Sequence, residues 1–303
     1  MLKWNIIGVF MDIRSLRYFL AVAREENMSK AADFLHVTQP TLSKQVKALE
    51  EELGKKLFIR HSFNIELTEE GMLLRDRAED LIRMADKIEA EFVALDDVLG
   101  GELYFGLAES YQISYLAREI RKLKEKYHNI HYHITSGDTE QVIDKLDKGI
   151  LDFVVLAQEP DYHKYKAIEF PKGDIWGLVL RKDDVLAKKK KIGIKDLKGL
   201  PLYCSEQAWN GEIREWAGTA YNDLHLEGSF RLSYNASIFA KEGLGYLLTF
   251  DKLINTSKES ELCFIPLSPT LETKLYLVYN PYQTMTPIAE RFLEQVESSF
   301  RKE

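Results

Sequence analysis

Between residues 74 and 99 apolar side chains recur in alternating steps of four and three residues. They are Leu74, Ala78, Leu81, Ala85, Ile88, Phe92, Leu95 and Leu99. This heptad repeat keeps one apolar seam along a helix and favours a coiled coil, whereas a helix packed only on its own domain drifts towards a period of 3.6 residues. The segment therefore predicts a helix about 40 Å long. Two chains are expected to dimerise through a seam formed by Leu74, Leu81, Ile88, Phe92 and Leu95.

The residues before this seam predict three short helices. Apolar residues spaced three and four apart mark the first helix over 16–23. Ser29 is expected to cap a second, short helix, and Thr38 a third that ends at Gly54. The buried stripe of the third helix is expected to comprise Leu42, Val46, Leu49 and Leu53.

The opposite face of the third helix is short, polar and basic at its centre. At about 100° per residue it carries Pro40, Ser43, Lys44 and Lys47, with Gln39 at the N-terminal end. A short helix, a tight turn and a second helix with such a face form a helix-turn-helix, whose second helix enters the major groove of DNA. Gln, Ser and Lys can contact base edges, and the free N–H groups of a helix start can hold a phosphate. The alternative is a solvated face on an ordinary three-helix bundle.

A β-hairpin with a polar tip is predicted over 55–67, where it would form a wing beside the helices. The chain has a formal net charge of -7, but residues 12–66 hold nine Lys or Arg against eight Asp or Glu, a local net charge of +1. Because electrostatic footprints are local, the acidic total does not exclude a nucleic-acid partner.

Beyond Gly100 strands and helices alternate, which predicts parallel α/β layers. Strands are expected at 103–108, 130–135 and 151–157, helices around 116–127 and 142–146, further elements at 175–181, 202–204, 213–220, 230–234, 245–250, 263–267 and 275–279, and a closing helix at 286–301. In such sheets ligands bind beyond the carboxyl ends of the strands. Candidate side chains at those ends are Ser110, Ser136, Thr139, Ser205, Asn235 and Ser237, although each is equally suited to cap a helix.

Several classes of protein are disfavoured. The apolar runs are far shorter than the roughly 20 residues of a membrane helix, and residues 1–10 lack the cleavage site of a signal peptide, so a cytoplasmic protein is expected. The only cysteines, Cys204 and Cys263, have no metal-ligand or disulfide spacing and are interpreted as core residues. No metal and no cofactor are expected. Catalysis is not expected either, because Cys204-Ser205-Glu206 lacks an identifiable base.

From Met11 onward the chain resembles the LysR-type transcriptional regulators. The resemblance is carried by LRYFLAVAREENMSKAADFLHVTQPTLSKQVKALEEELGKKLFIR (16–60) and LTEEG (67–71), with weaker support from EGLGYLL (242–248). It implies a winged helix-turn-helix, a dimerising linker helix and a two-lobed α/β effector domain similar to periplasmic binding proteins. It also implies a homotetramer, a small-molecule effector that controls DNA bending, and RNA polymerase as a further partner.

The resemblance also implies domain limits: an N-terminal extension at 1–10, a DNA-binding domain at 11–68, a linker helix at 69–99 and an effector domain at 100–303. Lobe I of the effector domain would comprise about 101–170 and 270–303, and lobe II about 171–269.

Site residues follow by matching position. Those expected to face the operator are Thr38, Gln39, Pro40, Ser43, Lys44 and Lys47, with Arg60 on a phosphate at the wing. Those expected to line the effector cleft are Ser110, Ser136, Thr139 and Ser205.

Three features of the sequence qualify the resemblance. The wing tip carries Phe63, Asn64 and Glu66 where the family usually has further arginines, so a shallower salt dependence of DNA binding is expected. Asp138 at the cleft edge either faces a cationic effector or caps a helix. The family includes peroxide sensors with a cysteine pair, but the two cysteines here lack that close spacing, which favours ligand sensing.

A second hypothesis keeps the α/β part as the functional unit. In that case the chain is a small-molecule-binding protein or an enzyme, and its N-terminal helices serve as a dimerisation module. Salt-sensitive binding to DNA distinguishes the regulator from this alternative.

Overall fold

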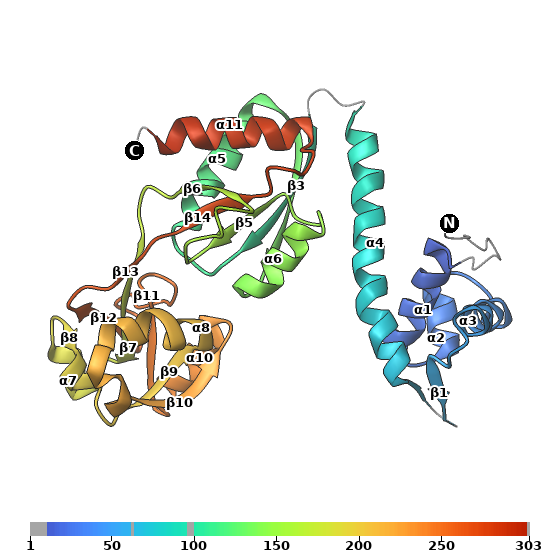
Figure 1. Cartoon of the computed structure of the whole chain (residues 1–303). Helices are drawn as coiled ribbons and strands as arrows, with labels where there is room; N and C mark the ends of the chain where they lie inside the picture. The colour runs from blue at the N-terminus through green and yellow to red at the C-terminus, as the bar shows by residue number, and fades with distance from the viewer. Residues whose placement is uncertain (1–10, 62–63, 96–99, 302–303) are drawn as a thin grey trace. The chain divides into compact units, whose positions relative to one another are not determined.

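The computed structural model describes residues 11–61, 64–95 and 100–301 (Figure 1). The extension at 1–10, Phe63 of the wing tip and Leu99 of the heptad repeat lie outside the described residues. The chain divides into two compact units, Met1–Val93 and Ala94–Glu303.

The described residues of the N-terminal unit form four helices and a two-stranded sheet. These are α1 (Ile13–Glu25), α2 (Met28–Phe34), α3 (Gln39–Leu53), β1 (Phe58–Arg60), β2 (Ile65–Leu67) and α4 (Glu69–Leu95). The helices α1, α2 and α3 pack around one core, to which β1 and the beginning of α4 also contribute. The predicted helix-turn-helix and wing are therefore present, and β1 pairs with β2 in antiparallel register.

The helix caps differ in part from the predictions. Asn27, not Ser29, caps α2, because the Oδ1 atom of Asn27 accepts from the N–H groups of Ser29 at 2.9 Å and Lys30 at 3.1 Å. Thr38 occupies the N-cap position of α3, but its Oγ1 is bonded to Oγ1 of Thr41 at 2.8 Å rather than to a backbone N–H. Gly54 ends α3 at a φ of 63°, a conformation that favours glycine.

The buried stripe of α3 is one residue shorter than predicted. Leu42, Val46 and Leu49 are buried against α1 and α2, whereas Leu53 is exposed. Leu53 is the last residue of α3, at the point where the chain turns away from the three-helix core.

The long helix α4 has 27 residues and so extends about 40 Å. Thr68 precedes it, and its Oγ1 accepts from the N–H of Gly71 at 2.9 Å and donates to the carbonyl of Lys56 at 2.7 Å. Ala78 is buried in the helix-turn-helix core and Leu74 packs against that core. Further along, Leu81, Ile88 and Phe92 are exposed, and the side chain of Leu95 lies outside the described part of the chain.

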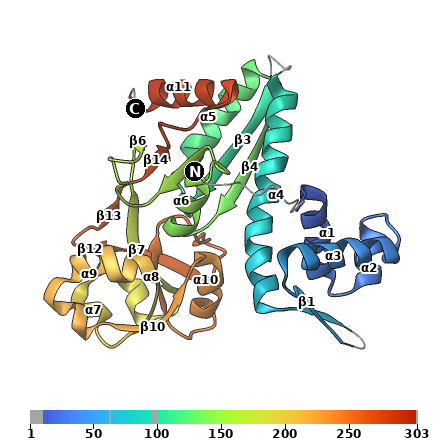
Figure 2. The same cartoon turned by 45° about the vertical axis from the view of Figure 1, so that its right-hand side comes forward.

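Lobe I of the effector unit is a five-stranded sheet in the order β4-β3-β5-β14-β6. Its elements are β3 (Gly100–Leu107), α5 (Ile113–Lys126), β4 (Asn129–Ser136), α6 (Thr139–Asp147), β5 (Phe153–Leu156), β6 (Lys166–Glu169), β14 (Tyr276–Tyr279) and α11 (Pro287–Phe300). Alternate side chains of β5 face opposite layers. Phe153 and Val155 pack with α5 and α11, whereas Val154 and Leu156 pack with α6. Figures 1 and 2 both show α5 and α11 together on one face of this sheet.

Lobe II is built on a second sheet in the order β10-β9-β11-β7-β12-β8, with β13 paired to β7. Its strands are β7 (Asp174–Arg181), β8 (Ile192–Gly193), β9 (Pro201–Ser205), β10 (His225–Phe230), β11 (Tyr246–Phe250), β12 (Leu262–Ser268) and β13 (Glu272–Thr273). Its helical segments are η1 (Val185–Lys188), α7 (Ile194–Leu197), α8 (Glu206–Ala208), η2 (Trp209–Ile213), α9 (Arg214–Ala217), η3 (Gly218–Asp223) and α10 (Ser233–Lys241). The core between this sheet and α7, α8 and η2 is separate from the core beneath α10.

Two sequence-based expectations for the effector unit are wrong. The sheets are mixed rather than purely parallel, because β14 runs antiparallel to β5 and β6, and β7 runs antiparallel to β11 and β12. The element expected at 230–234 instead spans the end of β10 and the start of α10, which places Asn235 and the buried Ser237 within a helix. Strand β14 forms where the chain returns from lobe II to lobe I, and it enters the lobe I sheet antiparallel to β5.

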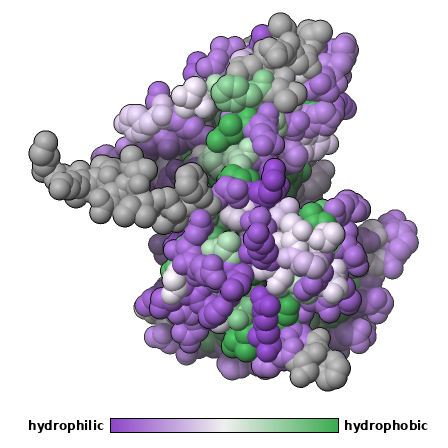
Figure 3. Space-filling model, turned by 90° about the vertical axis from the view of Figure 1, so that its right-hand side faces the viewer, coloured by the Kyte–Doolittle hydropathy of each residue, from purple (hydrophilic) through white to green (hydrophobic). Residues whose placement is uncertain are grey.

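The surface carries no sign of a membrane span in the part of the chain that the structure describes. No helix there is long and apolar enough to cross a bilayer. On the face drawn in Figure 3, hydrophobic residues form scattered patches among hydrophilic ones.

Candidate nucleic-acid interface and effector cleft

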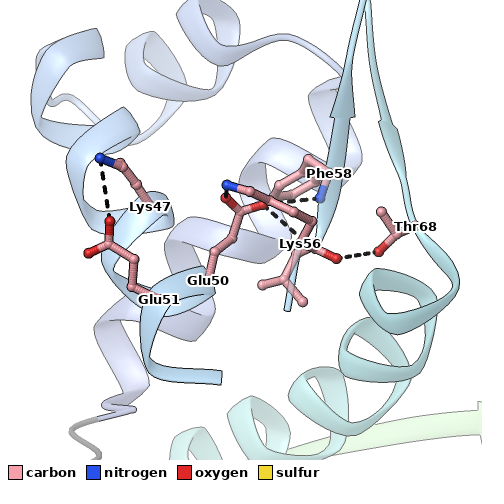
Figure 4. Close-up of polar contacts among 7 residues, drawn as sticks. Lys47, Glu50, Glu51, Lys56, Phe58 and Thr68 are labelled. Atoms are coloured by element: carbon pink, nitrogen blue, oxygen red, sulfur yellow. Dashed lines mark hydrogen bonds and ion pairs between the residues drawn. The ribbon is translucent and has the colours of Figure 1, made fainter. Parts of the chain in front are cut away.

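The outer face of α3 gathers the residues predicted to contact DNA. Thr38, Gln39, Pro40, Lys44 and Lys47 are exposed, and Ser43 is half-buried. The buried stripe of α3 holds this face outward. In Figure 4 the Nζ of Lys47 points towards Oε1 of Glu51, 3.4 Å away and one turn along α3. Both side chains of this pair are about two-thirds exposed, so Lys47 keeps most of its hydration.

The wing is attached to α3 through Glu50. The Oε1 of this buried side chain accepts from the N–H of Leu57 at 2.9 Å and that of Phe58 at 3.4 Å, and its Oε2 pairs with Nζ of Lys56 at 2.8 Å (Figure 4). Burial acts to raise the pKa of Glu50, but the hydrogen bonds from Lys56, Leu57 and Phe58 outweigh it and leave the pKa below its ordinary value. Glu50 is therefore ionised at neutral pH and fixes where β1 begins.

Arg60, the predicted phosphate contact, is exposed at the end of β1 opposite Ile65. Beyond it, the N–H of His61 donates to the carbonyl of Asn64 at 2.9 Å. The carboxylate of Glu66 lies 3.5 Å from Nε2 of His61 and accepts from Nδ2 of Asn64 at 2.9 Å. Weak phosphate contact at the wing tip stays a prediction, and the structure places the carboxylate on which it rests beside His61 and Asn64.

A cavity with a volume of about 840 Å³ lies between lobes I and II. It opens at the carboxyl ends of two sets of parallel strands, β3, β4 and β5 in lobe I and β9, β10 and β11 in lobe II. This is the position at which open α/β sheets bind ligands, and the volume lies within the range of small-molecule sites. We refer to this cavity as the cleft.

The structure brings together two of the four predicted cleft residues. Thr139 and Ser205 line the cleft from opposite lobes. Oγ1 of Thr139 donates to Oε1 of Gln207 at 3.2 Å, and Oγ of Ser205 accepts from the N–H of Ala208 at 3.4 Å. Ser110 and Ser136 are not among the lining residues, and the Oγ of Ser110 instead accepts from the N–H of Gln112 at 2.9 Å.

Apart from Asp138, which was expected at the cleft edge, the charged lining was not predicted from the sequence. Five carboxylates face the cleft, namely Glu109, Asp138, Glu140, Glu206 and Glu212. The one cationic residue in the described lining is Arg231, whose Nε lies 3.7 Å from Oδ2 of Asp138. Glu109 and Glu206 stand beside Ser110 and Ser205 in the chain. The acidic residues next to these two serines in the sequence could therefore have identified part of the carboxylate lining.

Asp138 has the capping role that was one of its two predicted alternatives. Its Oδ1 accepts from the N–H of Gln141 at 3.0 Å and thereby caps α6. Its other oxygen faces Arg231, so the single guanidinium in the lining already has a carboxylate opposite it.

Asp174 is a buried carboxylate where the chain crosses from lobe I to lobe II. It begins β7 and pairs there with Thr273 of β13, and its side chain is 2% exposed. Its Oδ1 accepts from Nε2 of Gln112 at 3.2 Å, while Oδ2 has no hydrogen-bond partner among the described residues. Burial raises the pKa of Asp174 to about 6, against the opposing effect of hydrogen bonds from Ser110 and Gln112.

The two cysteines lie apart in lobe II. Cys204 is buried on β9 and Cys263 is half-buried on β12, and both are free thiols. Burial raises the pKa of each thiol, which lowers its thiolate fraction and its reactivity. Within the described ranges, no group of three or more His, Cys, Asp or Glu side chains is arranged to hold a metal ion.

Comparison with protein families matches both units. A family model described as "Bacterial regulatory helix-turn-helix protein, lysR family" matches residues 13–72. A second, described as "LysR substrate binding domain", matches residues 96–301.

Individual relatives span nearly the whole chain. The hydrogen peroxide-inducible genes activator of Pectobacterium carotovorum subsp. carotovorum is 27% identical over 303 residues and covers 96% of each chain. The DNA-binding transcriptional dual regulator OxyR of Escherichia coli (strain K12) is 29% identical over 299 residues, which cover 96% of this chain and 95% of that protein.

Solved structures share the fold. The crystal structure of CbnR, a LysR family transcriptional regulator, matches 96% of this chain and 99% of its own with a TM-score of 0.77 and 20% identity. Full-length CbnR complexed with its target DNA matches 95% of this chain and all of its own, with a TM-score of 0.76 and 21% identity.

Proposed function

This chain belongs to the LysR family of bacterial transcriptional regulators, and from that premise we propose how its parts divide the work. It is a DNA-binding regulator with an effector-binding domain rather than an enzyme. In our proposal α3 contacts the operator, α4 joins two copies, and the cleft binds a small effector. Assembly into a tetramer, contact with RNA polymerase and a cytoplasmic location belong to the same proposal and rest on the family resemblance.

The observation that carries the DNA-reading proposal is the division of α3 into two faces. Leu42, Val46 and Leu49 are buried, so the side chains opposite them are held outward on a rigid helix. Ser43 and Lys44 lie at the centre of that outward face and have the length and donors to contact base edges, while Lys47 and Arg60 suit phosphates.

The test is a gel-shift titration against the intergenic DNA upstream of the protein's own gene, at two salt concentrations and with competitor DNA. Ser43→Ala and Lys44→Ala should each weaken operator binding by about 1 to 3 kcal/mol if they touch base edges. Arg83→Ala, which removes an exposed cation from α4, is the matched control and should leave binding unchanged. Unchanged affinity in both α3 variants would remove this face from the DNA contact.

The dimer proposal rests on the apolar residues that α4 leaves uncovered. Leu81, Ile88 and Phe92 are 45%, 46% and 68% exposed, although they continue the spacing of Leu74 and Ala78, which pack on the helix-turn-helix core. A second α4 in a coiled coil would cover them. Two reading heads on one dimer would then contact two half-sites of an operator.

The oligomeric state, measured by sedimentation, tests this proposal directly. Ile88→Asp places a charge in the proposed seam and should dissociate the dimer at micromolar protein concentration. Glu89→Lys changes the charge of the next residue on α4, is exposed, and should leave the assembly intact. A dimer that persists in the Ile88→Asp variant would place the interface elsewhere.

For the cleft we propose ligand binding rather than thiol oxidation as the controlling event. A relative of this chain is named as an activator of hydrogen peroxide-inducible genes. In this chain, however, β9 and β12, which hold Cys204 and Cys263, are separated by β11 and β7. Three strand spacings amount to about 14 Å, twice the roughly 7 Å over which two Cα atoms can be joined by a disulfide.

Peroxide treatment distinguishes the two mechanisms. DNA binding by the parent protein and by a Cys204→Ser/Cys263→Ser double variant should respond equally little to hydrogen peroxide. A peroxide response that the double variant loses would establish thiol sensing and contradict the ligand proposal.

A further inference from the structure

The cleft combines one sign of charge with an apolar wall, and this combination defines a class of ligand. We propose that the effector is an organic cation, with one or more ammonium or guanidinium groups on an apolar skeleton. The proposal rests on the function proposed above for the cleft and specifies the chemistry of its ligand.

The carboxylates come from both sides of the cleft. Glu109, Asp138 and Glu140 belong to lobe I, and Glu206 and Glu212 belong to lobe II. Against these five, the described lining contains one guanidinium and neither lysine nor histidine, and that guanidinium faces Asp138. Like charges on two facing lobes repel each other, so a cation between them stabilises the closed arrangement, whereas an anion adds to the repulsion.

The helix starts that would favour an anion are used by the protein itself. Asp138 accepts from the N–H of Gln141 at the start of α6. At the start of α10, Oε2 of Glu109 accepts from the N–H of Ser233 at 2.7 Å. Helix starts attract anions through such N–H groups, and here two side-chain carboxylates already occupy them. An anionic effector would have to displace one of them.

The remaining carboxylates are free to receive a ligand. No ion pair of Glu140, Glu206 or Glu212 exists within the described part of the chain. Glu212 is half-buried, and its carboxylate accepts from its own backbone N–H and, at 3.5 Å, from Oγ1 of Thr273. Burial raises the pKa of Glu212, and a bound cation would reverse that effect by pairing with the ionised form.

The apolar wall fits the same class of ligand. Trp176 and Phe250 line the cleft and pack edge to face with ring centroids 4.5 Å apart, and Leu248 lies beside them. Aromatic faces attract ammonium and guanidinium groups, and apolar walls bind the skeleton that carries them. A small inorganic cation has no apolar skeleton to place against this side of the cleft.

The test is isothermal titration calorimetry on the full-length protein with two sets of probes. The cationic probes are 1,4-diaminobutane, spermidine and agmatine, and the anionic probes are succinate and benzoate. The variant Glu140→Gln/Glu206→Gln removes one exposed, unpaired carboxylate from each lobe without changing side-chain shape. Glu125→Gln, on the exposed face of α5 and outside the lining, is the matched control.

We expect saturable binding of at least one cationic probe. The double variant should weaken that binding by about tenfold or more, because an ion pair in a partly enclosed site contributes on that order. Glu125→Gln should leave it unchanged, and the two anionic probes should not bind.

Three results would overturn the proposal. If a cationic probe bound the parent and the double variant equally well, it would be binding the acidic surface of the protein in general rather than the cleft. If succinate or benzoate bound, and bound more tightly to the double variant, the ligand of the cleft would be an anion. The cleft would then still be an effector site. The absence of binding by every cationic probe would contradict the proposed ligand class. Failure of the proposed regulator function would appear separately, as loss of specific DNA binding in a gel shift.

Discussion

The N-terminal unit and the effector unit each bury a carboxylate, and they satisfy its charge in opposite ways. Glu50 has the ammonium group of Lys56 and the N–H groups of Leu57 and Phe58, so its pKa lies below the ordinary value. Asp174 has the side chain of Gln112 but leaves one oxygen without a partner among the described residues, so burial raises its pKa to about 6.

The difference follows from where each carboxylate lies. Glu50 joins two parts of one compact unit, and its donors on Lys56, Leu57 and Phe58 lie six to eight residues along the chain. Asp174 lies at the crossing between two lobes, where β13 and the loop before α5 supply few donors. We infer that Glu50 stabilises one arrangement, whereas Asp174 costs stability at neutral pH where the lobes meet.

The largest expected effect is on the pH dependence of the effector unit. The pKa of Asp174 is raised from 3.8 to about 6, so the folded state binds more protons than the unfolded state between these values. Stability therefore falls as pH rises through this window, by about 3 kcal/mol. The Asp174→Asn variant lacks this loss. Its free energy of unfolding should therefore exceed that of the parent by an amount that grows from pH 4 to pH 7, as measured by calorimetric unfolding.

A neighbouring carboxylate provides the control for that experiment. The charge of Asp251 contributes to the raised pKa of Asp174. Asp251→Asn should shift the pH window downward but not abolish it. An unfolding profile of the Asp174→Asn variant that runs parallel to the parent at every pH would contradict the assignment.

A smaller effect is expected at Glu50. Glu50→Ala leaves the buried N–H groups of Leu57 and Phe58 without an acceptor, which should cost about 2 kcal/mol. Glu50→Gln keeps an acceptor and should cost less. Hydrogen–deuterium exchange of the segment 55–60 is the measurement, and exchange should quicken more in the alanine variant than in the glutamine variant.

The pH dependence at Glu50 has the opposite sign to that at Asp174. Because the folded-state pKa of Glu50 is lowered, its contribution is present above the unfolded value of 4.5 and is lost as pH falls through the folded-state pKa. The difference in free energy of unfolding between the parent and the Glu50→Gln variant should therefore become smaller at acidic pH. A constant difference down to low pH would show that charge has no part in the contact.

The smallest effect is expected at the exposed pair Lys47 and Glu51. Glu51→Gln should leave the melting temperature unchanged, because exposed ion pairs contribute little. It frees Lys47 and should slightly strengthen DNA binding at low salt, an increase that disappears as salt is added. A drop in affinity would show that Glu51 itself accepts from a base.

Periodic patterns in the sequence were sufficient to predict α3 and α4 and the faces of these helices that stay exposed. The heptad spacing predicted α4, and the stripe of Leu42, Val46 and Leu49 predicted the outward side of α3, because a helix must bury its apolar stripe. Caps were less predictable. Asn27 and Ser29 are both good capping residues two positions apart, and only the path of the chain decided between them.

The tertiary structure alone decided which polar side chains meet. Glu109 and Ser233 are 124 residues apart in the chain, yet they form a hydrogen bond across the cleft, and Asp138 and Arg231 face each other in the same way. These contacts depend on how the two lobes pack and on the direction of the strands in each sheet. Neither can be predicted from a local sequence pattern. The sequence by itself therefore determined a DNA-binding unit, a linker helix and an α/β effector unit. The acidic character of the cleft arose only on folding, as did the burial of Asp174 with one carboxylate oxygen that has no partner among the described residues.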